Sequence, residues 1–465
     1  MSFDSPIFLF LFLPVLLILE ALIKPVRAKN VLLCLAGLIF YAFGELWALA
    51  LLLVSALVNW LLGLAAIRRA RWAVPLAAVL NLGLLAAAKY LGFFGEGLSL
   101  LGLNVNLPAI VAPAGVSFFT FKGISYVVDA HRSPESGARS FFAALFYISF
   151  LPEVISGPLT RFSDFSERLY ERSRGWLDAA EGLRRFALGL AKKLILSGAA
   201  ASAADAAFSA GAALDARVAW LGAIAYTLQL YFDFSGYSDM ACGLGRALGF
   251  KCAENFDHPY AAVSITDFWR RWHISLSSWF RDYLYIPLGG SRRGKWRAAA
   301  NKAIVFVLCG LWHGASMTFV LWGAWHGLLS ALESLKVLDV KRWRKNPAGR
   351  ALSRVYTLLA VCLGFTMFRA ASVAEGFDMI AAMFAGWDFS LAGSALLADA
   401  LGGWTLFALI FGCAAASPIL SRLKARLGGR PAAELAGYAA SLALLVLSFA
   451  ALASGGFAPF IYAQF

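Results

Sequence analysis

Two histidines lie in a stretch of the chain that is otherwise apolar apart from small hydroxyl residues. The stretch runs from Ala303 to Ser330, and His313 and His326 each stand inside a Trp-His-Gly triplet. Ionisable side chains in apolar segments are costly, so an imidazole there marks either a functional site or a satisfied hydrogen bond. We interpret His326 as a hydrogen-bonded structural histidine. We interpret His313 as functional, because Gly310 and Gly314 flank it and would let a substrate or another backbone approach.

The chemistry available to such an imidazole is proton transfer. The ordinary pKa of histidine lies near roughly 6.5, so its neutral form is a suitable general base near neutral pH. If Lys302 marks the edge of a bilayer, a helical rise of about 1.5 Å per residue puts His313 roughly 16 Å deep, near the middle of the hydrocarbon layer. We therefore predict that His313 acts where little water competes.

A second polar cluster lies between Ser264 and Gly290. Ser264 followed by Asp267 is a capping-box start, which predicts a helix. At about 100° per residue, the polar side chains of this helix fall within roughly a third of its circumference, opposite the aromatic ones. This polar strip consists of Asp267, Arg270, His273, Ser277 and Arg281. Such a strip suits a phosphate-bearing or acyl-carrying ligand, although an interfacial amphipathic helix has the same periodicity.

A third cluster directly follows the apolar run from Trp220 to Leu230. Two carboxylates and two serines surround Gly236 here, and they are Asp233, Ser235, Ser238 and Asp239. In an apolar environment these residues would break a helix, or line one that faces water or a ligand. A polar turn at the end of a helix is the plainer alternative.

The elements that must position these clusters are predicted to be membrane helices. Of the 465 residues, 60% are hydrophobic and 15% charged, which is too apolar for an ordinary soluble domain. Several windows approach the roughly 20 apolar residues that a spanning helix needs. They are Ile7–Ile23, Leu46–Ala66, Trp72–Ala88, Trp404–Leu420 and Leu435–Ala453. We estimate about ten to twelve membrane passes, some of them re-entrant, and predict an all-α polytopic membrane protein.

The formal net charge of +14 comes from basic residues in short loops between apolar runs. These loops are Lys24–Lys29, Arg68–Arg71, Arg292–Lys302, Lys341–Arg350 and Arg422–Arg430. This is the positive-inside pattern, which places the loops in the cytosol and both termini outside. A role in nucleic-acid binding is not expected, because no basic patch sits on a soluble module. Six cysteines without close pairing and five histidines show no metal-ligand spacing, so we expect no metal site.

Five motifs of the chain resemble, in the same order, the membrane-bound O-acyltransferase superfamily and its bacterial alginate O-acetyltransferase (AlgI-type) branch. They are Asp233–Met240, Glu254–Tyr260, Asp267–His273, Trp279–Gly290 and Leu311–Gly314. The likeness extends to Phe8–Pro14, Ser156–Pro158, Phe368–Ala370 and Phe460–Phe465, so it covers nearly the whole chain. Departures are few, and they include Glu153, where family members often carry a neutral side chain, and Ala463 in place of a common aromatic residue.

The resemblance implies one integral-membrane domain over residues 1–465, with a ring of transmembrane helices around a thin central region and a tunnel. Residues 226–330 would form its catalytic core segment. His313 matches the catalytic histidine of the superfamily, and His273 matches the second histidine of the bacterial branch. The remaining site residues are candidates for substrate binding, and they are Asp233, Ser235, Asp239, Asn255, Arg270, Ser277 and Arg281.

The implied activity is transfer of acetyl groups from cytosolic acetyl-CoA, across the bacterial cytoplasmic (inner) membrane, to an extracytoplasmic polysaccharide such as alginate. A periplasmic or membrane-anchored partner acetyltransferase of the SGNH type is expected, as is contact with membrane lipid, but no tightly bound cofactor. His313 would take the proton of the acceptor hydroxyl, and His273 or the strip from Arg270 to Arg281 would steady the developing oxyanion. The basic group Arg292–Arg297 would attract the phosphates of coenzyme A or act only as a topology signal.

The end of the chain, residues 454–465, is expected to be an extracytoplasmic tail. It resembles the tyrosine-bearing tail of the small protein that accompanies D-alanyl transferases of this superfamily. Tyr462 is therefore a hypothetical transient acyl carrier, and a terminal aromatic membrane anchor is an equal alternative. For the whole chain, the competing functions are a peptidoglycan or other cell-wall O-acetyltransferase, a D-alanyl transferase for teichoic acid and, outside enzymes, a transporter.

Overall fold

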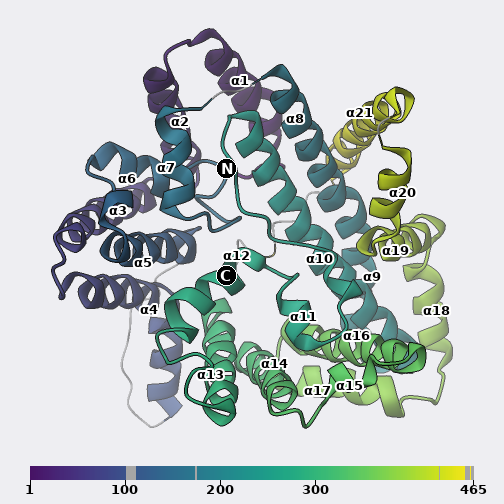
Figure 1. Cartoon of the computed structure of the whole chain (residues 1–465). Helices are drawn as coiled ribbons and strands as arrows, with labels where there is room; N and C mark the ends of the chain where they lie inside the picture. Colours follow the sequence, from purple (N-terminus) through teal and green to yellow (C-terminus); the bar gives the residue numbers. More distant parts are fainter. Residues whose placement is uncertain (101–111, 173–174, 429, 456–460, 462–465) are drawn as a thin grey trace. The chain divides into compact units, whose positions relative to one another are not determined.

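The computed structural model of the chain describes residues 1–100, 112–172, 175–428, 430–455 and 461 (Figure 1). Over these residues the fold is helical and contains no β-strand, which confirms the all-α prediction. A single isolated antiparallel bridge joins Phe256 and Trp272 within the same described part. The described residues form two compact units: Met1–Phe186 with Tyr237–Glu254 make up the first, and Ala187–Gly236 with Asn255–Ile461 the second.

The first unit is built from the amino-terminal helices. They are η1 (Phe8–Phe12), α1 (Leu13–Leu22), α2 (Val26–Ala42), α3 (Leu46–Ile67), α4 (Ala73–Leu100), α5 (Val116–Arg132), η2 (Pro134–Ser136), α6 (Phe141–Ile148) and α7 (Phe162–Tyr170). Helices α8 (Trp176–Ala191) and α10 (Ala216–Ala247) each run through a boundary between the units.

The second unit contains the remaining helices and, with them, most of the predicted site. They are η3 (Lys192–Ser197), α9 (Gly198–Phe208), η4 (Gly211–Ala213), η5 (Pro259–Ala261), α11 (Ile265–Trp269), α12 (Ile274–Phe280), η6 (Arg281–Tyr285), α13 (Lys295–His313), α14 (Met317–Leu335), α15 (Val340–Trp343), α16 (Pro347–Arg369), α17 (Val373–Ala385), α18 (Leu391–Ala400), α19 (Gly403–Ala416), α20 (Ile419–Leu427) and α21 (Pro431–Ala453).

Five helices among the described residues are long and apolar enough to cross a membrane. They are Leu46–Ile67, Ala73–Leu91, Trp176–Phe208, Pro347–Arg369 and Pro431–Ala453. A sixth span is possible if α18 and α19, bent by 75° at a short break, form one. Three of the five predicted windows are confirmed as spans, whereas Phe8–Leu22 is a shorter apolar helix.

The count of five or six is below our sequence estimate of about ten to twelve passes. That prediction rested on the number of apolar stretches, and several of these stretches form helices that are short or carry charges. Helix α10, for example, contains both Asp233 and Asp239, and α13 begins with Lys295 and also contains Lys302.

A buried ion pair joins α5 to the loop that follows α6 in the first unit. Lys122 Nζ lies 2.8 Å from Glu153 Oε2, and each side chain is 1% exposed. Lys122 Nζ also donates to the Tyr147 carbonyl at 2.7 Å, and the Thr160 hydroxyl donates to the other Glu153 oxygen. Each carboxylate oxygen of Glu153 therefore has a partner within the fold.

Candidate active site

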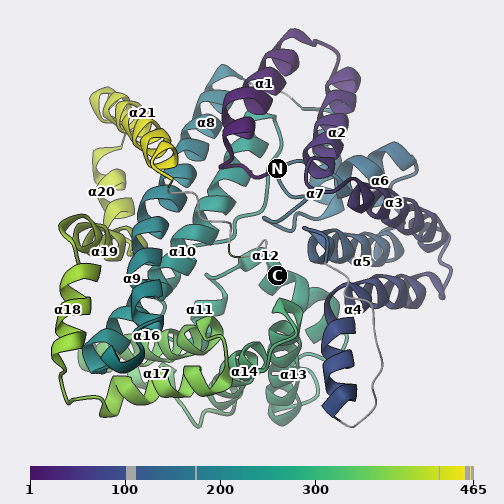
Figure 2. The ribbon, with the colours of Figure 1, turned by 180° about the vertical axis from the view of Figure 1, so that it is seen from behind.

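Helices α13 and α14 pack as an antiparallel pair that places His313 at the end of α13 (Figure 1, Figure 2). A Cβ atom added to Gly310 would lie 2.3 Å from the Phe319 carbonyl oxygen, and one added to Gly323 would lie 2.4 Å from that of Phe306. The two backbones therefore touch where glycine leaves room for them. Of the two reasons expected for Gly310, the close approach of another backbone is the one that the structure shows.

His313 is 2% exposed and lies among aromatic rings contributed by three helices. Its ring centroid is 5.1 Å from that of Trp322 on α14 and 5.1 Å from that of Phe368 on α16, with both rings edge-on. The ring centroid of Trp312, the preceding residue in the chain, is 4.7 Å from that of His313. This shell fixes the orientation of the imidazole and keeps its surroundings largely apolar.

His273, the second predicted catalytic histidine, contacts the same shell. Its ring centroid lies 6.5 Å from that of Trp312, so both histidines border one indole ring. His273 is 1% exposed, and its Nδ1 lies 3.4 Å from Asn255 Oδ1. The structure therefore brings His313 and His273 to one indole ring, that of Trp312, and places Asn255 beside His273.

The predicted continuous helix from Ser264 to Arg281 is wrong, because the chain breaks at His273. Helix α11 ends at Trp269, and α12 restarts after His273, whose φ of 44° is left-handed. Such a conformation costs a residue other than glycine about 1–3 kcal/mol and needs support from its surroundings. Asn255 gives that support: its Oδ1 accepts from the amide and the hydroxyl of Ser275, at 3.2 and 2.6 Å.

The capping-box start is confirmed. The Ser264 hydroxyl accepts a hydrogen bond from the amide of Asp267 at 3.0 Å, and α11 begins at Ile265, directly after Ser264. The Asp267 carboxylate accepts from the Val263 amide and pairs with Arg271, 3.1 Å away. Asp267 therefore holds the start of the helix, and its partners are structural.

A pocket of about 410 Å³ lies between α11, α12, η6 and α13. Three members of the predicted strip, Arg270, Ser277 and Arg281, line it together, whereas His273 does not. Arg281 also pairs with Asp282, at 2.7 Å. The break at His273 thus separates the strip into a buried imidazole and a basic pocket wall.

Most of the other lining residues were not predicted as site residues, and Thr266, Lys302 and Cys309 are the polar and nucleophilic ones with most bearing on a ligand. The signal was available in α13, because Lys302, Val305, Phe306 and Cys309 follow helical spacing and all line the pocket. His313 stands four residues after Cys309, one turn further along the same face. The pocket therefore approaches the histidine shell along α13.

The cluster around Gly236 is neither a break nor a turn, because α10 continues through it from Ala216 to Ala247. A Cβ atom on Gly236 would lie 2.7 Å from the Gly189 carbonyl oxygen, so the glycine permits close packing against α8. Asp233 lies in the second unit and pairs with Lys193, 2.6 Å away, with both side chains buried. Ser235 is also buried.

Asp239 belongs to the first unit and lies 2.8 Å from Arg185. The same guanidinium binds both oxygens of Glu254, each at 2.6 Å. This network involves α8, α10 and the segment after α10, which makes it a helix-positioning contact.

The predicted hydrogen bond of His326 is found at one ring nitrogen, whereas the buried Nε2 has no hydrogen-bond partner among the described residues. His326 is fully buried, and its Nδ1 accepts from the indole of Trp269 at 3.3 Å. Arg292, Arg293, Lys295 and Arg297 are exposed. Tyr462 lies outside the described residues.

Helices apolar enough to span a membrane, together with a buried imidazole beside a basic pocket, define an integral-membrane protein with a site suited to proton transfer. Comparison with known proteins narrows this class. Residues 111–374 match MBOAT, the membrane-bound O-acyltransferase family. The chain belongs to this family, and it is an acyltransferase.

Several bacterial proteins are similar over most of their length. A probable alginate O-acetylase AlgI of Pseudomonas putida is 39% identical over 403 residues, which cover 84% of this chain and 82% of that protein. A peptidoglycan O-acetyltransferase of Helicobacter pylori is 36% identical, over 68% of this chain and 67% of the relative. A teichoic acid D-alanyltransferase of Bacillus subtilis is 28% identical, over 56% and 69%.

Proposed function

We propose that this acyltransferase moves acetyl groups from cytosolic acetyl-CoA across the bacterial inner membrane for O-acetylation of an extracytoplasmic polysaccharide such as alginate. The observation that carries the proposal is the basic pocket, which reaches Cys309, one helical turn from His313. Relatives named as alginate O-acetylases support the substrate class. A single membrane domain with a ring of helices and a tunnel joining the two aqueous sides belongs to this proposal.

In the proposed reaction, His313 accepts the proton of the acceptor hydroxyl while the hydroxyl oxygen attacks the acetyl carbon. The new C–O bond forms, the thioester C–S bond breaks, and the thiolate of coenzyme A leaves and takes up the proton. His273 borders the same indole and would stabilise the oxyanion in the transition state. Asn255 is then a positioning residue, because it supports the backbone at His273.

The pocket supplies charges suited to the phosphates of coenzyme A. Arg270, Arg281 and Lys302 line it, and Lys302 also donates to Ser334 at 2.5 Å. Guanidinium and ammonium groups are the usual protein ligands of phosphate. Ser277 lies on the same wall and adds a hydroxyl donor. We still propose that Asp233, Ser235 and Asp239 contribute to binding of the acceptor. The two carboxylates also have structural partners, because each forms an ion pair within the fold.

Replacing Arg270 with glutamine should raise the KM for acetyl-CoA about tenfold and change kcat little, because a charged hydrogen bond to phosphate contributes to ground-state binding. Steady-state kinetics in detergent or proteoliposomes would measure this. Arg344→Gln, the same change at an exposed arginine outside the pocket, is the matched control. If the KM for acetyl-CoA is unchanged in Arg270→Gln, this pocket does not bind the acetyl-CoA donor.

Membranes of the source bacterium, which contain its partner proteins, would test the function. We expect labelled acetyl-CoA to give alkali-labile label on added alginate. Peptidoglycan as the only labelled acceptor would favour the activity named for the Helicobacter relative. Transfer only from a D-alanyl carrier protein would favour the teichoic acid activity. A periplasmic SGNH-type partner is expected to complete the transfer.

We also propose Tyr462 as a transient acyl carrier. Its phenol would be the acceptor hydroxyl of this step and would take the acetyl group as coenzyme A leaves; a polysaccharide hydroxyl would then take the acetyl group from the ester and restore the phenol. The neighbouring Ile461 donates its amide to Asp233 Oδ2 at 2.9 Å, so the chain just before Tyr462 is anchored at a buried carboxylate. Mass spectrometry of the protein from the labelled incubation should find acetyl on Tyr462. Unlabelled Tyr462 during turnover would leave the membrane-anchor alternative.

A further inference from the structure

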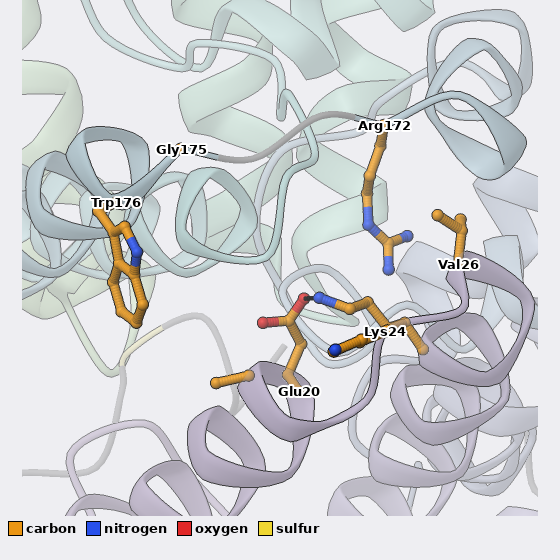
Figure 3. Close-up of a pocket in the computed structure, with 8 residues that line it drawn as sticks. Glu20, Lys24, Val26, Arg172, Gly175 and Trp176 are labelled. Carbon is orange, nitrogen blue, oxygen red and sulfur yellow. Dashed lines mark hydrogen bonds and ion pairs between the residues drawn. The ribbon is translucent and has the colours of Figure 1, made fainter.

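A second basic pocket lies in the first unit, and none of the residues that line it belongs to the acyltransferase site. It occupies about 330 Å³ between the end of α1, the start of α2 and the segment that leads into α8 (Figure 3). Lys24, Lys29 and Arg172 face it, together with Glu20 and Trp176. The proposed function uses none of these side chains, and the sequence analysis treated Lys24 and Lys29 only as a topology signal.

The charges of this pocket do not balance. Glu20 pairs with Lys29, with Oε1 and Nζ 2.7 Å apart, which leaves Lys24 and Arg172 as excess positive charge. Burial lowers the pKa of Arg172 to about 10, and burial together with the Arg172 charge lowers that of Lys29. Arg172 nevertheless stays charged at neutral pH, so the pocket keeps a positive field.

Arg172 is held rigidly with one donor group aimed into the pocket. Its side chain is buried, its Nη1 donates to Asn30 Oδ1 at 2.6 Å, and its guanidinium lies 4.7 Å from the Phe250 ring centroid. Nη2 is buried and has no hydrogen-bond partner among the residues that the structure describes. Figure 3 shows the guanidinium pointing toward Glu20 and Lys24 across the pocket. A buried guanidinium donor without an acceptor is costly, so an anionic ligand would stabilise it.

Exposed apolar side chains stand at the pocket or next in sequence to it, and we call them its apolar rim. Trp176, which lines the pocket, is 84% exposed, and Leu177 and Leu22, each adjacent in sequence to a lining residue, are 77% and 71% exposed. Tryptophan beside basic residues is typical of the boundary between lipid headgroups and acyl chains. A ligand that combines a phosphate with hydrocarbon chains would satisfy the guanidinium and cover this rim.

We propose that this pocket binds the phosphate of an anionic phospholipid headgroup, with Arg172 and Lys24 on the phosphate and Trp176 against the upper acyl chains. The site would fix the first two helices and the start of α8 to one leaflet of the membrane. A soluble phosphate-bearing compound offers the same phosphate chemistry but leaves the apolar rim uncovered, and the experiment below separates the two.

The test is a native mass spectrometry titration of the full-length protein in detergent with phosphatidylglycerol. Phosphatidylcholine, inorganic phosphate and coenzyme A serve as competitors. We expect Arg172→Gln to weaken phosphatidylglycerol binding about tenfold and Lys24→Gln about fivefold. Arg27→Gln changes an exposed arginine at the start of α2 that does not line the pocket, so it should bind like the parent protein.

Lys24→Gln keeps the result interpretable if Arg172→Gln fails to fold, because Lys24 is exposed. Equal binding by Lys24→Gln and Arg27→Gln would overturn the site. Binding of phosphatidylcholine as tight as that of phosphatidylglycerol would overturn its charge selectivity. Displacement of the lipid by inorganic phosphate or coenzyme A at comparable concentration would overturn the lipid as its occupant.

Discussion

Replacing His313 with glutamine is expected to lower kcat for acetyl transfer by about 10²–10⁴-fold, with the protein still folded. General-base catalysis contributes a factor of this size, and glutamine fills similar space without a titratable nitrogen near neutral pH. The measurement is release of coenzyme A in proteoliposomes, with folding checked by size-exclusion chromatography. His313→Ala should lose at least as much activity.

The matched control is His326→Gln, which changes the other histidine of a Trp-His-Gly triplet. His326 accepts from Trp269 and is fully buried, so its loss should lower the melting temperature in detergent while kcat changes much less. Normal turnover by His313→Gln would take His313 out of the mechanism. Equal loss of kcat in both variants would assign the effect to packing.

Access to His313 adds a condition to this prediction. The pocket between α11, α12, η6 and α13 is lined by Cys309 but not by His313. His313 is 2% exposed, and its ring lies against those of Trp322 and Phe368. If His313 is the base, we expect a side chain of this aromatic shell to move before an acyl group reaches the imidazole. Enzymes commonly gate buried sites by such local movements.

The second large effect is expected at Lys122. Lys122→Met should destabilise the fold by about 3–5 kcal/mol, because it leaves the Glu153 carboxylate buried with one fewer partner. The readout is the melting temperature and the yield of monodisperse protein in detergent. Lys251→Met, at an exposed lysine of the same unit, should have little effect.

The double variant Lys122→Met with Glu153→Gln distinguishes a stranded charge from lost packing. If the stranded carboxylate causes the loss, removing both charges should recover much of the stability. Additive losses in the double variant would contradict this explanation. The acidic residue at position 153 thus has a lysine as its buried partner.

The sequence by itself determined the class of the protein and supplied His313 as the proposed base. Composition and apolar windows predicted helices in a membrane, because water is a poor solvent for a chain in which 60% of the residues are hydrophobic. The Ser264 cap was predictable from a spacing of three residues, and the structure confirms it. His313 was singled out from the two histidines of the apolar run because Gly310 and Gly314 flank it, and its role as the base stays a prediction.

Only the tertiary structure decided how the polar residues are grouped. Periodicity placed His273 on the same helix face as Arg270, yet Asn255, 20 residues before Ser275, caps a new helix and turns the imidazole into the aromatic shell. Arg172 meets Asn30 across 142 positions, and no local pattern records that contact. Local spacing reports which side chains share a helix face, whereas ion pairs and caps between distant segments depend on how the helices pack.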